Sequence, residues 1–256
     1  MTALLQTRGL EVAIAGKCIC RGFDLAIERG QCWGMLGRNG IGKTTLLHTL
    51  AGLRAPLAGA TLLEGVTLDT LPRRRIAQSI GVLFQHSEDP FPGTVLETVL
   101  IGRHPYLAAW QWEGAEDRRR AQQALAAVGM EEMMDRQVAT LSGGERQRLA
   151  IATLLIQEPR LMLLDEPANH LDLHHQIAIL DLLAGQVRDE GRALLMIGHD
   201  LNLTARYCDH ALLLFGEGET LCGEVAEVLT ESHLERLYGH PIRCAEVKGR
   251  RVFVAG

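Results

Sequence analysis

The sequence predicts an α/β fold with a parallel core sheet, an antiparallel β subdomain at the N-terminus and an inserted α-helical subdomain. An apolar strand at 31–36 leads through a glycine-rich loop into a helix at 43–50, which is how a parallel α/β unit begins. Apolar strands at 161–164 and 193–197 are separated by a helical segment, so the same pattern resumes later. The intervening residues, from about 88 to 157, are mostly helical and contain no flexible linker.

The N-terminal residues alternate loosely between apolar and polar side chains, as half-buried strands do. One strand is predicted at 10–14, a turn at 15–17, and two partner segments at 18–20 and 23–27. We therefore expect a small antiparallel sheet before the parallel core.

The inserted region contains one clearly amphipathic helix, predicted at 117–128. Its residues Ala121, Leu125 and Val128 share one face, while arginines occupy the other. Gly129 suits the C-terminal end of this helix.

The C-terminal part adds a helix at 177–187 and a strand at 211–215. Because no repeat or tether interrupts the chain, we expect one domain rather than two. The expected division is a domain spanning 1–256, with an α/β core at 1–86 and 159–256 and the helical subdomain at 87–158.

Composition narrows the function classes. The 256 residues have a formal net charge of −5, with acids and bases mixed, so a nucleic-acid partner is not expected. The apolar runs fall far short of the roughly 20 residues that cross a bilayer, and the N-terminus lacks the pattern of a signal peptide. The six cysteines form no C-x-x-C pair, which favours reduced, mostly buried thiols in the cytoplasm.

The segment Gly37–Thr44 fits the phosphate-loop pattern G-x-x-x-x-G-K-[ST], and so predicts a phosphate-loop NTPase core. Glycines let consecutive N–H groups face a triphosphate, and the following helix adds its positive N-terminal end. Lys43 can reach the β- and γ-phosphates, and the Thr44 hydroxyl can bind Mg²⁺. The residues predicted to bind nucleotide in this segment are Gly37, Asn39, Gly40, Gly42, Lys43, Thr44 and Thr45.

Two acidic residues follow the apolar strand at 161–164. Asp165, at the end of that strand, can place its carboxylate beside the Mg²⁺ ion. Glu166, one residue later, can orient or deprotonate the water that attacks the γ-phosphate. These residues predict the metal-binding and catalytic carboxylates of an ATP-hydrolysing enzyme.

The stretch LSGGERQR at 141–148 combines a helix cap with two glycines. Ser142 and Glu145 form a capping-box pattern that opens a helix running to Gln157. A cap does not require Gly143 and Gly144, which leave further backbone N–H groups open at the helix end. The chain therefore carries a second predicted anion site.

With these motifs together, nearly the whole chain resembles the ATP-binding-cassette (ABC) family, and LSGGERQR resembles its signature motif. The resemblance implies that two copies pair head to tail, with each ATP between one copy's phosphate loop and the other's signature. Ser142, Gly143 and Gly144 would then contact the γ-phosphate held by Lys43 of the second copy.

Other positions extend the resemblance. Gln85 resembles the glutamine that senses Mg²⁺ and links to the transporter, and His199 resembles the switch histidine that contacts the γ-phosphate and assists catalysis. Asn169 and Asp172 belong to a stretch that resembles the loop crossing the dimer interface. Ile14 occupies the position where the family usually has an adenine-stacking aromatic residue, so selectivity for adenine over guanine stays open.

Several stretches are similar to ATPase subunits of importers for cobalamin, ferric siderophores and haem. They are Phe91–Val95, Ile101–Tyr106, His199–Leu203 and Leu237–Gly239. The resemblance implies a peripheral subunit on the cytoplasmic face of the inner (plasma) membrane. Its partners would be integral permease subunits and, indirectly, a substrate-binding protein, with coupling contacts near 85–106.

Two alternative functions remain. An ATPase that serves a non-transport machine would have a soluble partner. A non-hydrolysing interaction module would not need Lys43, Asp165, Glu166 and His199 together.

Overall fold

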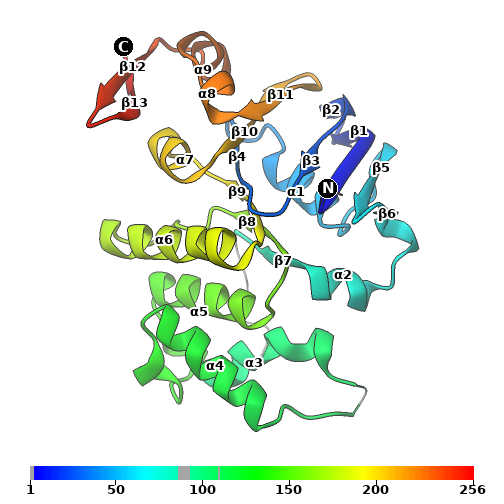
Figure 1. Cartoon of the computed structure of the whole chain (residues 1–256), viewed down its shortest axis with the longest axis vertical. Helices are drawn as coiled ribbons and strands as arrows, with labels where there is room; N and C mark the ends of the chain where they lie inside the picture. Colours follow the sequence, from blue (N-terminus) through cyan, green and yellow to red (C-terminus); the bar gives the residue numbers. More distant parts are fainter. Residues whose placement is uncertain (1–2, 86–92, 109) are drawn as a thin grey trace.

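The computed structural model describes residues 3–85, 93–108 and 110–256 (Figure 1). Its core is a six-stranded sheet in the order β11-β10-β4-β9-β8-β7, in which all neighbouring pairs are parallel except β10 and β11. The strands are β4 (Cys32–Gly37), β7 (Ile80–Leu83), β8 (Leu161–Asp165), β9 (Ala193–Ile197), β10 (His210–Gly216) and β11 (Glu219–Glu224). The predicted parallel α/β core is confirmed.

Helices cover both faces of this sheet, because alternate strand residues point to opposite sides. Leu163 and Leu195 share one buried cluster with Leu47 of helix α1 (Lys43–Leu50). Met196 on the other face shares a cluster with Leu183 of helix α6 (Leu173–Glu190). Helix α7 (Leu201–Tyr207) follows β9 and packs near β4. The carboxyl ends of β4, β8 and β9 therefore meet at one edge between two helical layers.

An antiparallel sheet precedes the core, as predicted. Its order is β2-β1-β5-β6, and β3 also pairs with β1. The strands are β1 (Leu5–Ile14), β2 (Lys17–Phe23), β3 (Ala26–Ile27), β5 (Ala58–Leu63) and β6 (Val66–Thr67). The predicted strand and turn at 10–17 lie within the β1–β2 hairpin.

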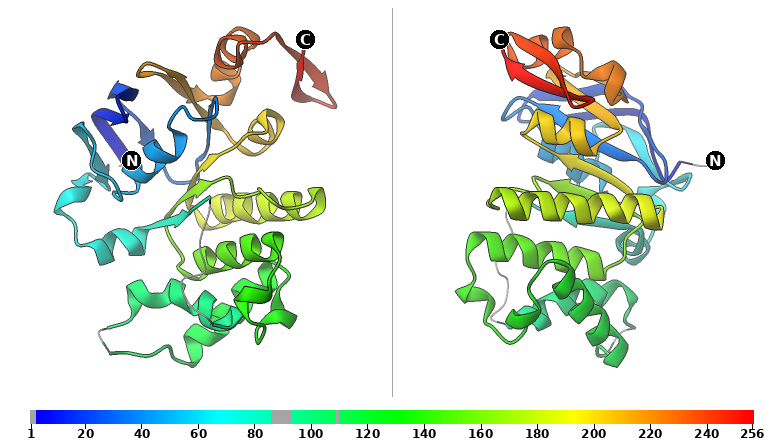
Figure 2. Two further views of the ribbon diagram at one scale, coloured as in Figure 1. Left: turned by 180° about the vertical axis from the view of Figure 1, so that it is seen from behind. Right: turned by 60° about the vertical axis from the view of Figure 1, so that its left-hand side comes forward.

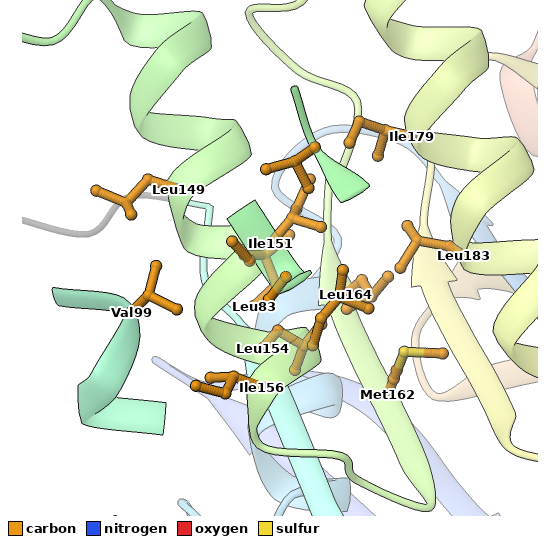
Figure 3. Close-up of a cluster of buried hydrophobic side chains, with 14 of the residues drawn as sticks. Leu83, Val99, Leu149, Ile151, Leu154, Ile156, Met162, Leu164, Ile179 and Leu183 are labelled. Atoms are coloured by element: carbon orange, nitrogen blue, oxygen red, sulfur yellow. The ribbon is translucent and has the colours of Figure 1, made fainter. Parts of the chain in front are cut away.

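A helical layer lies beyond α6, and both views of Figure 2 show it stacked below the sheet. Its elements are α3 (Val95–Leu100), η2 (Ile101–Tyr106), α4 (Ala115–Ala127), η3 (Glu131–Met133), η4 (Val138–Thr140) and α5 (Gly143–Ile156). Leu149 and Leu154 of α5, Val99 of α3, Leu164 of β8 and Ile179 of α6 belong to one buried cluster (Figure 3). The helical layer and the sheet therefore share a continuous core.

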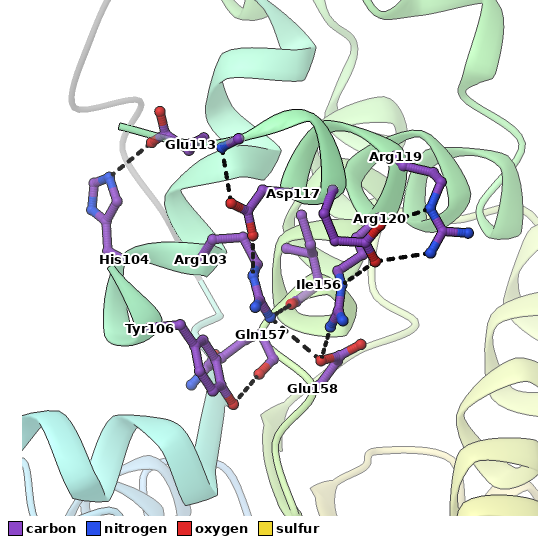
Figure 4. A network of polar contacts seen from close by, with 12 residues as sticks. Arg103, His104, Tyr106, Glu113, Asp117, Arg119, Arg120, Ile156, Gln157 and Glu158 are labelled. Carbon is purple, nitrogen blue, oxygen red and sulfur yellow. Dashed lines mark hydrogen bonds and ion pairs between the residues drawn. The ribbon is translucent and has the colours of Figure 1, made fainter. Parts of the chain in front are cut away.

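Polar contacts also join the helical layer to the chain entering β8 (Figure 4). The buried Arg103 donates from Nε to Asp117 Oδ1 at 2.9 Å and from Nη1 to the Ile156 carbonyl at 3.1 Å. The Tyr106 hydroxyl donates to the Gln157 carbonyl at 2.9 Å. Because β8 begins four residues after Gln157, these bonds fix the link between α5 and the site-bearing strand.

The remaining elements are α2 (Arg73–Ser79), η1 (Leu68–Thr70) and a C-terminal unit. This unit consists of α8 (Val225–Val228), α9 (Glu231–Tyr238) and the hairpin β12 (Ile242–Val247) and β13 (Arg250–Ala255). It shares a third buried cluster with β10. In the described ranges, no helix has the length and apolar character needed to cross a bilayer.

Several element boundaries differ from the sequence predictions. The helix predicted at 177–187 begins at Leu173, because the Asp172 side chain accepts a hydrogen bond from His175 N at 2.9 Å and caps it. The helix predicted at 117–128 begins at Ala115. All six cysteines are free, but only Cys20, Cys32 and Cys208 are buried, while Cys18, Cys222 and Cys244 are partly exposed.

Candidate functional site

The phosphate-loop segment connects the carboxyl end of β4 to α1, where Gly42 is the N-cap. Gly42 has φ +108°, and a Cβ at this position would lie 2.5 Å from Ile19 Cδ1, so only glycine fits. In the part of the chain that the structure describes, no side chain caps α1, and its first turn contains no acidic residue. The first N–H groups of the helix therefore stay available for an anion.

Lys43 is directed back onto the loop that precedes it. Lys43 is buried, with 7% of the residue exposed. Its Nζ donates to the Gly37 carbonyl at 2.8 Å and to the Arg38 carbonyl at 3.2 Å. Burial lowers the pKa of Lys43, while the nearby carboxylates of Glu166 and Asp165 oppose that change. Lys43 thus places a cationic donor inside the loop, where a phosphate can replace the carbonyl oxygens as its partner.

Asp165 meets α1 at the end of β8. The Thr44 hydroxyl donates to Asp165 Oδ2 at 2.6 Å, and the residue is 1% exposed. Burial raises the pKa of Asp165, and the hydrogen bond from Thr44 opposes that increase. The other oxygen, Oδ1, is buried and has no hydrogen-bond partner among the described residues. An orphaned carboxylate oxygen beside a hydroxyl is a donor set that fits Mg²⁺.

Glu166 occupies a strained backbone position, with φ +54°, immediately after β8. Its Oε1 pairs with His199 Nε2, and its Oε2 accepts a hydrogen bond from Asn169 Nδ2 at 2.9 Å. Gln147 of α5 donates from Nε2 to the Glu166 carbonyl at 3.3 Å and the Pro167 carbonyl at 3.0 Å. No role was predicted for Gln147, because nothing in its helical pattern indicates a contact with Pro167, 20 residues away.

Most of the predicted nucleotide-site residues gather around an open pocket beyond the carboxyl ends of β4, β8 and β9, although Asp165 does not line it within the described part of the chain. Its lining residues are Ile14, Asn39, Gly40, Gly42, Lys43, Thr44, Thr45, Gln85, Glu166 and His199. Ile14 is 39% exposed and offers an apolar surface without an aromatic ring. Gly37 lines an adjoining hollow with Asn39, His199 and Tyr238. Tyr238 contributed to the importer resemblance, but no role in the site was predicted for it.

Ser142, Gly143 and Gly144 do not line this pocket within the described part of the chain. The Ser142 hydroxyl accepts from Glu145 N at 3.3 Å, and Ser142 N donates to Glu145 Oε2 at 2.7 Å, so the capping box is confirmed. A Cβ placed at Gly143 would lie 3.9 Å from His170 Cβ, and one at Gly144 would lie 3.2 Å from the His170 carbonyl oxygen. In a single chain, Asn169 bonds to Glu166 and Asp172 caps α6, so both side chains of the predicted interface loop have partners within the chain.

A family model matches more than half of this chain, and several known proteins are similar to it over most of its length. The family model described as "ABC transporter" matches residues 20–169. A petrobactin import ATP-binding protein of Bacillus anthracis is 37% identical, over 98% of this chain and 97% of that protein. A ferric enterobactin transport ATP-binding protein of Escherichia coli is 37% identical, over 94% and 89%. A hemin import ATP-binding protein of Bordetella avium is 37% identical, over 92% of each.

Solved structures support the same relationship. An inward-facing ABC transporter described as of the metal-chelate type superposes with a TM-score of 0.85 at 28% identity, over 99% of this chain and 97% of that one. A dimeric ATP-binding cassette bound to ADP and phosphate has a TM-score of 0.74 at 25% identity, over 86% and 98%.

Proposed function

This chain belongs to the ABC transporter family of ATPases, and we propose that it powers an importer of a ferric siderophore or haem. The observation that carries the ATPase part is one pocket that gathers Lys43, Thr44, Glu166 and His199. The cargo rests on the petrobactin, enterobactin and hemin relatives. Cobalamin stays a prediction from the sequence motifs alone.

In this proposal the phosphate loop binds the ATP phosphates. The free N–H groups of the loop and α1 surround the charge, and Lys43 Nζ exchanges its two carbonyl partners for phosphate oxygens. The adenine packs near Ile14 through apolar contact. This arrangement binds phosphate strongly and distinguishes bases weakly.

Mg²⁺ would be held by Thr44, Asp165 and Gln85. The unpaired Oδ1 of Asp165 and the adjacent Thr44 hydroxyl supply oxygen ligands, and Gln85 lines the same pocket. When bound, the ion neutralises negative charge on the phosphates.

Glu166 is the proposed general base. Its carboxylate is oriented by His199 on one oxygen and by Asn169 on the other, which fixes where a water proton can be accepted. His199 can exchange this contact for the γ-phosphate when nucleotide is present. The pair therefore links the state of the base to the presence of the phosphate.

A second copy would complete the site. Ser142, Gly143 and Gly144 lie at the N-terminus of α5 and away from the pocket of their own chain, so they are available to the nucleotide of another copy. Asn169 and Asp172 would contribute to the contact between the copies. The dimeric relative with ADP and phosphate supports this arrangement.

The α/β core (1–86 and 159–256) and the helical subdomain (87–158) are proposed as two parts of one ATPase domain. Coupling to integral permease subunits on the cytoplasmic face of the membrane would use the residues near 85–106. Phe91 and Pro92, which contributed to the importer resemblance, lie outside the described residues.

Reconstitution with the native membrane subunits in vesicles tests the function. Uptake of haem and of ferric siderophores would be measured with and without Mg-ATP, and cobalamin would be included as a third cargo. The proposal expects ATP-dependent uptake of one iron chelate. A soluble partner without a permease would instead indicate a non-transport machine, and absence of phosphate release would indicate an interaction module.

A further inference from the structure

The C-terminal hairpin is joined to helix α7 through the side-chain amide of Asn202. Its Oδ1 accepts a hydrogen bond from Phe253 N at 2.7 Å, and its Nδ2 donates to the Phe253 carbonyl at 3.1 Å. Phe253 is buried in a cluster with Leu234 and Leu237 of α9, which fixes the backbone that the amide binds. One side chain thus pairs with the strand as a neighbouring strand would.

This contact lies at the end of α7 that is nearest to His199. Beyond it, α7 and the hairpin enclose a hollow lined by Ala205, Arg206, Val225 and residues of 249–253. The amide of Asn202 therefore bridges two elements that are otherwise separated over part of their length.

The first turn of α7 carries this contact to His199. Asp200 caps the helix, since its Oδ1 accepts from Asn202 N at 2.7 Å and from Leu203 N at 3.0 Å. The Thr204 hydroxyl donates to the Asp200 carbonyl at 3.1 Å. His199 is bonded directly to a residue whose side chain and main chain are both fixed by this turn.

The opposite side of α7 lies against β4, the strand that leads into the phosphate loop. A Cβ at Gly34 would lie 2.3 Å from Thr204 Cγ2, so the close contact requires glycine. Helix α7 is therefore held between β4 and β13. A loss of support from β13 would let the start of α7, and His199 with it, move relative to Lys43.

We propose that Asn202 is a positioning residue for His199, acting through the N-terminus of α7 and the C-terminal hairpin. The proposal rests on the proposed role of His199 in ATP hydrolysis. In this proposal, the His199–Leu203 stretch and the hairpin, which lies more than 40 residues after the histidine, together hold His199 in position.

A double-mutant cycle in the full chain tests this. Asn202→Ala, His199→Ala and the double variant are compared with the unchanged chain for ATP hydrolysis, affinity for ATP and thermal unfolding. Asn202→Ala should lower kcat roughly tenfold, as loss of support for an active-site group does, with unchanged ATP affinity. In the His199→Ala background, the same substitution should cause no further loss.

Arg243→Ala is the matched control, because Arg243 is an exposed hairpin residue that pairs with Glu235 at 2.8 Å. It should hydrolyse ATP at the unchanged rate. Asn202→Asp keeps the Oδ1 acceptor but places a carboxylate oxygen against the Phe253 carbonyl, so it breaks the same contact and carries the same comparison if Asn202→Ala does not fold. Equal losses in both backgrounds, or no loss at all, would overturn the positioning role while leaving the ATPase proposal intact. An unchanged chain without hydrolysis would instead refute the ATPase proposal itself.

Discussion

The two helix ends proposed to bind phosphate, at α1 and α5, differ in how their N–H groups are satisfied. Helix α1 begins at Gly42 with no side-chain cap and with Lys43 as its first residue. Helix α5 begins at Ser142 with a complete capping box and with Glu145 in its first turn. An uncapped, cationic helix end binds an anion by itself, whereas a capped end with an acidic residue binds it weakly alone.

We expect this difference to separate ATP binding, which would need the α1 end alone, from ATP hydrolysis, which would need both helix ends. The α1 end lies in the pocket with Lys43 and Glu166, so under the proposed function we expect one chain to bind ATP without a second copy. Under the proposed function, the capped α5 end would add its remaining N–H groups when a second copy presents a phosphate.

Lys43→Ala should remove both functions, because it deletes the cation at the uncapped helix end. Turnover should fall by roughly 10³- to 10⁵-fold, the range for losing a cation that stabilises a transferring phosphoryl group. ATP affinity, measured by titration calorimetry, should fall as well. Thermal unfolding without nucleotide checks that the fold is intact, and unchanged ATP affinity would contradict the prediction.

Glu166→Gln should remove turnover and retain binding. The amide cannot accept the water proton, so hydrolysis should fall by roughly 10²- to 10⁴-fold. Phosphate release and ATP affinity are the two measurements. A variant with near-normal phosphate release would remove Glu166 from the role of general base.

Gly143→Asp tests the capped helix end alone. Its Cβ meets no atom closer than 3.9 Å, and an acid in the first turn favours the helix by about 0.3–1 kcal/mol, so folding should be preserved. The added charge should repel the triphosphate and lower turnover by roughly 10²- to 10³-fold, with single-chain ATP affinity unchanged.

The effect of Gly143→Asp on ATP affinity shows whether α5 contacts the nucleotide of its own chain or that of a second copy. Weakened ATP binding by isolated single chains would mean that α5 contacts the nucleotide of its own chain. Gly143→Ala provides the neutral control and should retain most of the activity.

Ser142→Ala should have the smallest effect, and the effect should be on the free energy of unfolding. Loss of the N-cap hydroxyl typically costs about 1 kcal/mol, which denaturant unfolding can measure. Glu145 keeps its bond to the backbone N–H of residue 142. An unchanged unfolding free energy would show that the capping box contributes nothing measurable to α5.

Local patterns in the sequence predicted much of the core. Lys43–Leu50 and Ala193–Ile197 form the expected helix and strand, because each has a strong apolar pattern and a clear boundary signal. Strands β5 and β6 and the C-terminal hairpin were missed: β5 is half-buried but does not alternate, β6 has two residues, and β12 buries one side chain of six. Strand β5 is positioned by pairing with the distant strand β1, whereas β6 pairs with β5 and the two strands of the hairpin pair with each other.

The same limit applies to the site. Lys43, Asp165 and Glu166 belong to contiguous motifs whose chemistry can be read from residue type and spacing. The contacts of Gln147, Tyr238 and Asn202 depend on segments that the fold brings together. Asn202 and Phe253, for example, are 51 residues apart in the sequence. Residue type alone does not indicate such contacts.

Mixing two inactive variants shows whether each ATP site is shared between two copies of the chain. One chain carries Lys43→Ala with an intact α5 end, and the other carries Gly143→Asp with an intact phosphate loop. If each ATP lies between two copies, a mixed dimer contains one complete site, so the mixture should recover about a quarter of the unchanged rate from random pairing. A mixture that stays as inactive as its separate components would contradict an ATP site shared between copies.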